Sequence, residues 1–538
     1  LDKISCIVCF NTVYGLPRVD PIVLIDQGLV RGQKSTDNRY STFLGVPYAS
    51  VDLDDPFGPA RSAPSFGDTI FNANDDSIKC PQQALDLETQ IENDEHEILD
   101  CLRLNIYVPN IAGSNNPLPV FVWIHGGAFA IGSAGEQNGK YFMKQDIIVV
   151  TVNYRLGPYG FLCLDVPQVP GNQGLKDQNE ALVWVRKNIA AFGGNPYNVT
   201  IGGQSAGSAS VVHHLYSSKE KLYSKVVLES GTPFVDGAFV NGDVDAAIKL
   251  AGYLGLNTTD TEQALKFLTN TRHNLVTGAA TSLGLVLRPC KERSFSGVEN
   301  FIDSDPYSLS NLRKIRNTPI LIGHTDQEVT DLLTNTNYYG DDYFNKDPFK
   351  ARIAKNFNLD DEQLEVASNI VRHFYIGDKT ASRDMIEEIE MFESDFIYVH
   401  PIERTITDLL NENANPVYEY MFSYTGNTGL NGAGHSDELK YLFDAMNTGG
   451  EKSEEDELII DRITTLWANF IKYGDPTPQE TDLLPVTWKP LTSETRPYLV
   501  IDTNIRLDNR VYKERMAFWD LFYNIYGKYN NLIRECMS

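Results

Sequence analysis

Short, uninterrupted apolar segments rich in Val, Ile and Tyr recur along the chain, and they constrain its fold more than any other feature. Such runs are typical of strands that are buried on both faces. Segments with helical periodicity lie between them; in residues 177–192, Leu182, Val185 and Ile189 fall on one stripe. The predicted strands are PVFVWI (119–124), IIVVTVN (147–153), VTIGG (199–203), KVVLES (225–230), PILIGH (319–324), VYEYMF (417–422) and YLVID (498–502). This alternation predicts an α/β fold with a large, mixed, mostly parallel sheet flanked by helices.

An antiparallel hairpin is predicted at the edge of this sheet by the N-terminal segment IVLIDQGLVRG (22–32). The chain has 538 residues, of which 42% are hydrophobic, and this excludes a disordered or fibrous protein. No linker, low-complexity tract or internal repeat divides it, so residues 16–538 are predicted to form a single domain. The net charge of −26 opposes binding to nucleic acid and to anionic membranes. No apolar run reaches the roughly 18–20 residues that a membrane span requires.

The first residues, LDKISCIVCFNTVYG (1–15), combine an apolar run with small residues, Val13 and Gly15, ahead of a predicted cleavage point. This pattern favours the end of a secretory signal peptide over the alternative, a short edge strand. Two Asn-x-Thr triplets, at Asn198 and Asn257, are consistent with glycosylation of a secreted protein. We therefore expect an extracellular protein.

Seven cysteines occur, at positions 6, 9, 80, 101, 163, 290 and 536. Apart from CIVC in the signal-like segment they form no CxxC pair, and no Cys/His cluster has zinc spacing, so no metal site is predicted. Cys80 and Cys101 flank a polar, acidic stretch that has little means of packing itself. In an oxidising compartment they can form a disulfide that contributes on the order of 3 kcal/mol; two unpaired thiols are the alternative.

The segment VTIGGQSAGSASVV (199–212) contains a GxSxG motif, which is a weak signal on its own. Here a predicted strand precedes Ser205 and a helix-compatible segment follows it. A nucleophile at such a turn needs a strained backbone and small neighbours, which Gly203 and Gly207 supply. The N-terminus of the helix would also direct its dipole and free N–H groups toward the hydroxyl. We interpret Ser205 as a nucleophile rather than as a small residue that only permits helix–strand packing.

A serine hydroxyl becomes nucleophilic when a histidine accepts its proton and an acid orients that histidine. In enzymes with this type of turn the order along the chain is Ser, acid, His. Among the downstream histidines, His435 lies in the glycine-rich loop GAGHSDEL, where an imidazole is freely presented. The strand PILIGH runs into TDQEV, so either Asp326 or Glu328 can supply the acid.

Backbone donors for the charge that develops on the substrate are predicted in the segment WIHGGAFAIG (123–132). It follows a predicted strand and presents consecutive small residues whose amides can turn inward together. A loop of this type upstream of a GxSxG turn is the arrangement that acyl transfer requires. The two motifs predict an acyl hydrolase that needs no metal or cofactor.

Further motifs extend over most of the chain: FLGVPYA (43–49), DCLRLNIYVP (100–109), NYRLGPYGFL (153–162) and NQGLKDQNEALVWVRKNIAAFGGNP (172–196). From about residue 22 to the C-terminal helix the chain resembles the type-B carboxylesterases, the cholinesterase-like branch of the α/β-hydrolases. The resemblance implies an α/β-hydrolase fold with Ser205 as nucleophile, His435 as base and Glu328 as acid. It also implies an oxyanion hole formed by the amides of Gly127, Ala128 and Ala206.

The same resemblance assigns several supporting residues. It supports a Cys80–Cys101 disulfide, places Ser230 and Glu438 behind the histidine, and gives Asp177 and Arg186 structural roles. The glycine that usually follows the catalytic Glu is Val329 in this chain. The family's second and third cysteine pairs are missing, so Cys163, Cys290 and Cys536 are expected to be unpaired.

Gln204, immediately before the nucleophile, is the main sequence indication of the substrate. GQSAG is similar to insect juvenile hormone esterases and moth antennal esterases, whereas many relatives have Glu there. The Arg-Phe pair usual after the PYA segment is Arg61-Ser62, which argues against a specific juvenile hormone assignment. The stretch between Cys80 and Cys101 lacks the aromatic residue with which cholinesterases bind choline. The resemblance thus implies an esterase for hydrophobic, uncharged small-molecule esters; a noncatalytic adhesion or binding protein of the same fold is the alternative.

Overall fold

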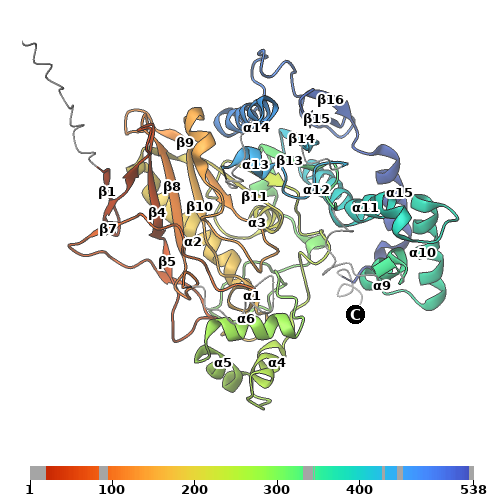
Figure 1. Ribbon diagram of the computed structural model, residues 1–538. Coiled ribbons are helices and arrows are strands. Elements are labelled where there is room, and N and C mark those ends of the chain that lie inside the picture. Colours follow the sequence, from red (N-terminus) through yellow and green to blue (C-terminus); the bar gives the residue numbers. More distant parts are fainter. Residues whose placement is uncertain are drawn as a thin grey trace, which may run out of the picture.

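The computed structural model describes residues 20–83, 95–330, 343–344, 346–426, 431–444 and 452–531. An eleven-stranded sheet runs through the molecule, with helices on both of its faces (Figure 1). Its strands are β3 (Gln33–Lys34), β4 (Tyr40–Pro47), β8 (Arg103–Pro109), β9 (Leu118–Ile124), β10 (Ile148–Val152), β11 (Gly194–Gln204), β12 (Lys225–Glu229), β13 (Ile320–Thr325), β14 (Val417–Phe422), β15 (Pro497–Ile501) and β16 (Arg506–Asn509). Their order is β16-β15-β14-β13-β12-β11-β9-β10-β8-β4-β3.

The strands from β10 to β15 in this order are parallel to one another, while β3, β4, β8 and β16 pair antiparallel. The prediction of a mixed, mostly parallel sheet is therefore confirmed. Successive residues of β9 pack into different cores: Val122 contributes to one, and Trp123 to the other. α2 (Gln173–Asn188) and α3 (Ala206–Tyr216) cover the first face, and α14 (Glu454–Tyr473) covers the second. Burial on both faces explains why the strands read as continuous apolar runs.

Most of the remaining helices form two groups beside the sheet, one below it and one at its right in Figure 1. The remaining helices are α1 (Gly157–Phe161), α4 (Ala246–Tyr253), α5 (Thr261–Thr269), α6 (His273–Ser282), α7 (Leu312–Ile315), α9 (Pro348–Asn356), α10 (Asp361–Ile376), α11 (Ile386–Ser394), α12 (His400–Asn411), α13 (Leu439–Leu442) and α15 (Lys513–Tyr526). A third core forms where α9, α10, α11 and α15 meet, and Trp519 and Phe522 are buried there. In the described ranges, we find no helix with the length and apolar character that crossing a bilayer would require.

The N-terminal hairpin forms as predicted, but it does not lie in the large sheet. β1 (Ile22–Ile25) pairs antiparallel with β2 (Gly28–Arg31), and β2 pairs with β7 (Ile70–Asn72) in a separate three-stranded sheet. The edge of the large sheet is β3 instead. The sequence of the hairpin could not reveal β7, because that partner lies some forty residues further along the chain. A small pair, β5 (Ala49–Ser50) and β6 (Arg61–Ser62), lies outside both sheets.

Two disulfides are present in the described residues. Cys80 bonds to Cys101, as predicted. Cys163 bonds to Cys290, so the expectation that these two residues are unpaired was wrong. Their separation of 127 residues hid the pair from sequence reasoning, because the fold alone brings the loop after α1 against the segment after α6. The signal-like residues 1–15, with Cys6 and Cys9, and the C-terminal Cys536 lie outside the described residues.

Candidate active site

Ser205 lies at the turn between β11 and α3, at the carboxyl end of a central strand. Its backbone has φ 56° and ψ −123°, a conformation that non-glycine residues rarely adopt. The flanking chain is very close: a Cβ on Gly207 would lie 2.0 Å from the Ile124 carbonyl oxygen, and one on Gly203 would lie 2.5 Å from the Gly207 carbonyl carbon. The two glycines therefore make the strained turn sterically feasible, as the sequence predicted.

Glu328 and His435 are brought together from segments 107 residues apart. The Nδ1–H of His435 donates to Glu328 Oε2 at 2.6 Å, and the His435 backbone N–H donates to the Glu328 carbonyl oxygen at 3.1 Å. Ser230 Oγ and the Thr325 N–H donate to the other carboxyl oxygen, Oε1, at 2.6 and 2.9 Å. Burial alone would raise the pKa of Glu328, but the charge of His435 and the hydrogen bonds from His435 and Ser230 outweigh it and lower the pKa. Glu328 is thus held as a carboxylate next to the imidazole.

Asp326, the other acid that the sequence left open, points elsewhere. Its Oδ1 accepts the Ala433 N–H at 2.7 Å and so shapes the loop that carries His435. Burial raises the pKa of Asp326 to about 6. Of the two candidates, only Glu328 contacts the imidazole in the described structure.

The second nitrogen of His435 faces Gln204 as well as the serine. Gln204 Nε2 lies 3.1 Å from His435 Nε2, and because Nδ1 carries the proton donated to Glu328, the amide is the donor. No hydrogen bond between Ser205 Oγ and His435 is formed in this part of the structure. Such bonds are often long in the absence of substrate and tighten when it binds. The imidazole is therefore oriented by Glu328 and Gln204 without a hydrogen bond to Ser205.

The segment after β9 wraps around Ser205. A Cβ on Gly126 would lie 3.1 Å from Ser205 Cβ, and Gly127 and Ala128 have φ values of 96° and 53°. The Gly127 carbonyl oxygen accepts the N–H groups of Ala130 and Ile131, which fixes the turn. Among the described residues, the N–H groups of Gly127, Ala128 and Ala206 have no acceptor. Three such donors beside a serine hydroxyl can bind an oxyanion.

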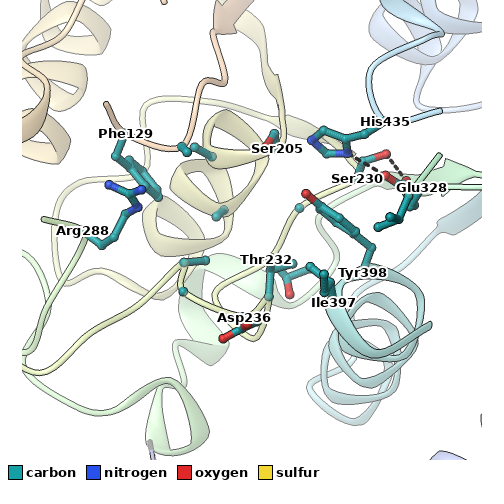
Figure 2. Close-up of a pocket in the computed structure, with 18 of the residues that line it drawn as sticks. Phe129, Ser205, Ser230, Thr232, Asp236, Arg288, Glu328, Ile397, Tyr398 and His435 are labelled. Carbon is teal, nitrogen blue, oxygen red and sulfur yellow. Dashed lines mark hydrogen bonds and ion pairs between the residues drawn. The ribbon is translucent and has the colours of Figure 1, made fainter. Parts of the chain in front are cut away.

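A cavity of about 560 Å³ opens in front of Ser205 (Figure 2). Apolar side chains of Phe129, Val235 and Ile397 contribute to its wall. The charged residues on the wall, besides the Glu328–His435 pair, are Asp236, Arg288, Arg352 and Lys355. Asp236 forms ion pairs with both Arg352 (2.7 Å) and Lys355 (3.0 Å).

Comparison with known proteins identifies the family of this chain. The model of the carboxylesterase family matches residues 19–519. The chain belongs to this family. It is 32% identical to the juvenile hormone esterase of Heliothis virescens, over 86% of this chain and 87% of that protein. It is 28% identical to esterase FE4 of Myzus persicae, over 84% and 83%. The crystal structure of juvenile hormone esterase from Manduca sexta, with OTFP covalently attached, superposes with a TM-score of 0.81 at 27% identity, covering 94% of this chain and 100% of that one.

In this carboxylesterase two more buried carboxyls lie behind the Glu328–His435 pair. Glu438, which the resemblance placed there, is fully buried and neither of its carboxyl oxygens has a hydrogen-bond partner among the described residues. Glu229, which sequence reasoning missed, accepts the Trp467 Nε1–H at 2.7 Å and has no other partner among the described side chains. Burial raises the pKa of Glu229 to about 8. Burial and the nearby Glu229 and Glu328 charges raise the pKa of Glu438 well above its usual value. Burial thus favours the protonated form of both carboxyls.

Other predicted positions of the carboxylesterase are placed as follows. Asp177 forms a buried ion pair with Arg155 (2.7 Å) rather than with Arg186, whose guanidinium lies 4.9 Å from the Tyr197 ring. Val329, which replaces the usual glycine, donates its N–H to Ser394 Oγ at 2.8 Å. Asn257 is exposed, whereas Asn198 is half-buried and its Oδ1 accepts from Lys225 Nζ at 2.5 Å.

Proposed function

We propose that this carboxylesterase hydrolyses hydrophobic, uncharged esters through an acyl-enzyme on Ser205. The observation that carries the proposal is the meeting of three features at one end of the cavity. These are the strained Ser205, the Glu328–His435 pair and the unpaired amides of the glycine-rich loop. Each feature alone can be explained by the packing of its own segment. Acyl transfer, however, needs a nucleophile, a base and oxyanion donors that all lie within about 3 Å of the reacting group, and these three features meet at one end of the cavity.

The reaction follows from this geometry. His435 Nε2 accepts the Ser205 proton as Oγ attacks the ester carbonyl carbon, and the three amides bind the resulting oxyanion. His435 then donates the proton to the alkoxide oxygen of the leaving alcohol, and the C–O bond breaks. Water attacks the acyl-enzyme, its proton passes to His435 and on to Ser205, and the carboxylic acid leaves. Glu328 stays ionised and stabilises the imidazolium in both halves.

The charges around the cavity support neutral substrates. Although the protein as a whole carries −26, the described part of the cavity wall carries Arg288, Arg352 and Lys355 against one carboxylate outside the Glu328–His435 pair, Asp236. Arg352 also pairs with the buried Glu393. A quaternary ammonium ester such as acetylthiocholine would meet these cations, and on the described wall only Phe129 and Tyr398 offer an aromatic ring. We therefore favour esters such as pheromone acetates, juvenile hormone-like methyl esters, or plant and xenobiotic esters.

We also propose an extracellular location. Two disulfides, Cys80–Cys101 and Cys163–Cys290, favour an oxidising compartment, and the exposed Asn257 is the more accessible of the two glycosylation triplets. Treatment of the native protein with an N-glycosidase tests this: a mass loss that disappears in Asn257→Gln is expected. Unmodified Asn257 in protein purified from its natural source would contradict it.

Labelling with an organophosphate separates the enzyme from the alternative, a noncatalytic binding protein. We expect mass spectrometry to find the adduct on Ser205, and Ser205→Ala to lower nitrophenyl ester hydrolysis by about 10³-fold or more with unchanged folding. No adduct and no hydrolysis in folded protein would favour the binding protein. A panel of esters then tests the substrate class; a strong preference for acetylthiocholine would contradict it.

A further inference from the structure

Tyr398 lies against the face of the His435 imidazole. The two ring centroids are 4.5 Å apart and the ring planes are inclined by 33°. Glu328 and Gln204 contact the edges of the same imidazole at Nδ1 and Nε2. Figure 2 shows the Tyr398 ring between the histidine and the open cavity, whose wall it helps to form. The histidine is thus held at both nitrogens and over one face.

An irregular helical turn places Tyr398 there. Residues Asp395–Val399 form a π-helical turn between α11 and α12, and the His400 N–H bonds to the Asp395 carbonyl oxygen five residues earlier. Pro401, which has no N–H, begins the next turn and cannot continue the ordinary i→i−4 pattern. Such turns are rare inside helices and are frequent at functional sites. The wider turn changes the direction in which the following side chains project.

The turn is fixed to the catalytic loop. The buried Asp395 carboxylate accepts hydrogen bonds from Arg515 (2.6 Å) and from the Tyr375 hydroxyl (2.7 Å). Ser394 Oγ accepts the N–H of Val329, the residue directly after Glu328. This hydrogen bond therefore links the segment that carries Tyr398 directly to the segment that carries Glu328, the acid that orients the histidine.

We propose that Tyr398 is a positioning residue that stabilises the protonated form of His435 through its aromatic face. The inference rests on the proposed function, in which His435 becomes an imidazolium in each half-reaction. The negative face of an aromatic ring attracts a cation that lies over it within about 6 Å. The ring also limits rotation of the imidazole away from Ser205.

Other titratable groups surround the histidine and are the same in every variant described below. Glu328 contacts it directly. Glu229 and Glu438 lie behind that carboxylate, and Asp326 and Asp437 shape the loop that carries His435. If the substitution of Tyr398 alone changes the protonation of His435, the change is therefore due to the Tyr398 side chain.

The test compares Tyr398→Leu with Tyr398→Phe in the full chain. For Tyr398→Leu, we expect the acid limb of the kcat/KM profile on a neutral nitrophenyl ester to move to lower pH by about 0.5 unit. Its kcat at the plateau should fall about 2- to 5-fold. Tyr398→Phe keeps the ring and should match the wild type in both. Phe374→Leu, which removes an aromatic ring from α10 outside the described cavity wall, serves as the matched control and should leave the midpoint of the acid limb unchanged.

Three results would overturn the inference. An equal loss in Tyr398→Phe would assign the effect to the hydroxyl. An acid limb that moves to higher pH in Tyr398→Leu would show that the ring acts by excluding water, since water stabilises the imidazolium. An acid limb that does not move in Tyr398→Leu would show that Tyr398 has only a packing role. NMR titration of the His435 imidazole, assigned with His435→Gln, measures the same shift without turnover. It therefore tests Tyr398 even if the wild type fails to hydrolyse esters, a result that would instead contradict the proposed function.

Discussion

The disulfide between Cys163 and Cys290 is predicted to stabilise the protein more than the one between Cys80 and Cys101. The first closes a loop with a sequence separation of 127, and the second closes one of 21. Because a cross-link restricts the unfolded chain more when the loop is longer, the loop-entropy relation gives about 5 kcal/mol for the first and about 3 kcal/mol for the second. Replacing each pair by serines should therefore lower the free energy of unfolding by different amounts.

Thermal unfolding measures this difference. With an entropy of unfolding of about 1.1 kcal/mol/K for a chain of this length, the Cys163→Ser/Cys290→Ser variant should lose about 4 °C in Tm. The Cys80→Ser/Cys101→Ser variant, which serves as the control, should lose about 3 °C. Calorimetry on both variants and the wild type gives the comparison, and non-reducing peptide mapping verifies the bonds.

The Cys163–Cys290 bond also supports the cavity. Val286 and Arg288, which line the cavity, immediately precede Cys290 in a segment without helix or strand. Two hydrogen bonds between Asn172 and the Cys290 backbone, of 2.7 and 3.0 Å, remain when the disulfide is lost. Loss of the disulfide should therefore loosen this part of the cavity wall without detaching it. We expect KM for a bulky ester to rise several-fold, while the rate at which a small organophosphate labels Ser205 stays the same. Free thiols in the native protein, or a Tm no lower than that of the control variant, would refute the reasoning.

Three further substitutions test the site. Gly207→Ala should lower Tm and abolish nitrophenyl ester hydrolysis, because its Cβ would lie 2.0 Å from the Ile124 carbonyl oxygen; normal Tm and activity would show that the turn can relax. Gln204→Glu replaces an amide donor, 3.1 Å from His435 Nε2, by a carboxylate that stabilises the imidazolium. The acid limb of kcat/KM should move to higher pH by about 1 unit, and a shift to lower pH would contradict this. Glu438→Gln matches the protonated carboxyl in shape, so kcat/KM at neutral pH should stay within about 3-fold of wild type; a loss as large as that of Glu328→Gln would show that Glu438 acts as an anion.

The parts of the fold that follow from local periodicity could be predicted. Val122 and Trp123 are neighbours on one strand and are buried in opposite cores, so that strand had to read as a continuous apolar run. The turn at Ser205 was predictable for the same reason, since strand, small residues and helix are adjacent in the sequence. The choice between Asp326 and Glu328 was not local, because it depends on how the loop after β13 meets the loop that carries His435.

The features that sequence reasoning missed depend on contacts between distant segments. Cys163 and Cys290 carry no spacing signal, and Trp467 reaches Glu229 from a helix 238 residues further along. Pro401 was the one available indication of the irregular turn before it, since a proline inside a helical pattern marks a break in the hydrogen bonding. The position of Tyr398 over His435 still required the tertiary structure.

The number of hydrogen-bond donors decides which buried carboxyl near the histidine is ionised. Glu328 accepts from His435, Ser230 and Thr325, and its pKa lies below the usual value despite complete burial. Among the described residues, Glu229 has a single donor and neither oxygen of Glu438 has a partner, so burial raises the pKa of both carboxyls. Three carboxylates at this depth would repel one another. Because the raised pKa values favour the neutral form of Glu229 and Glu438, Glu328 is the carboxylate that contacts the imidazole, and the uncharged Gln204 and Tyr398 contact its other nitrogen and its face. That arrangement places the ionised Glu328 on the side of the imidazole away from Gln204. The other carboxylate on the described cavity wall, Asp236, is paired with Arg352 and Lys355, so it is not left to attract a cationic ester.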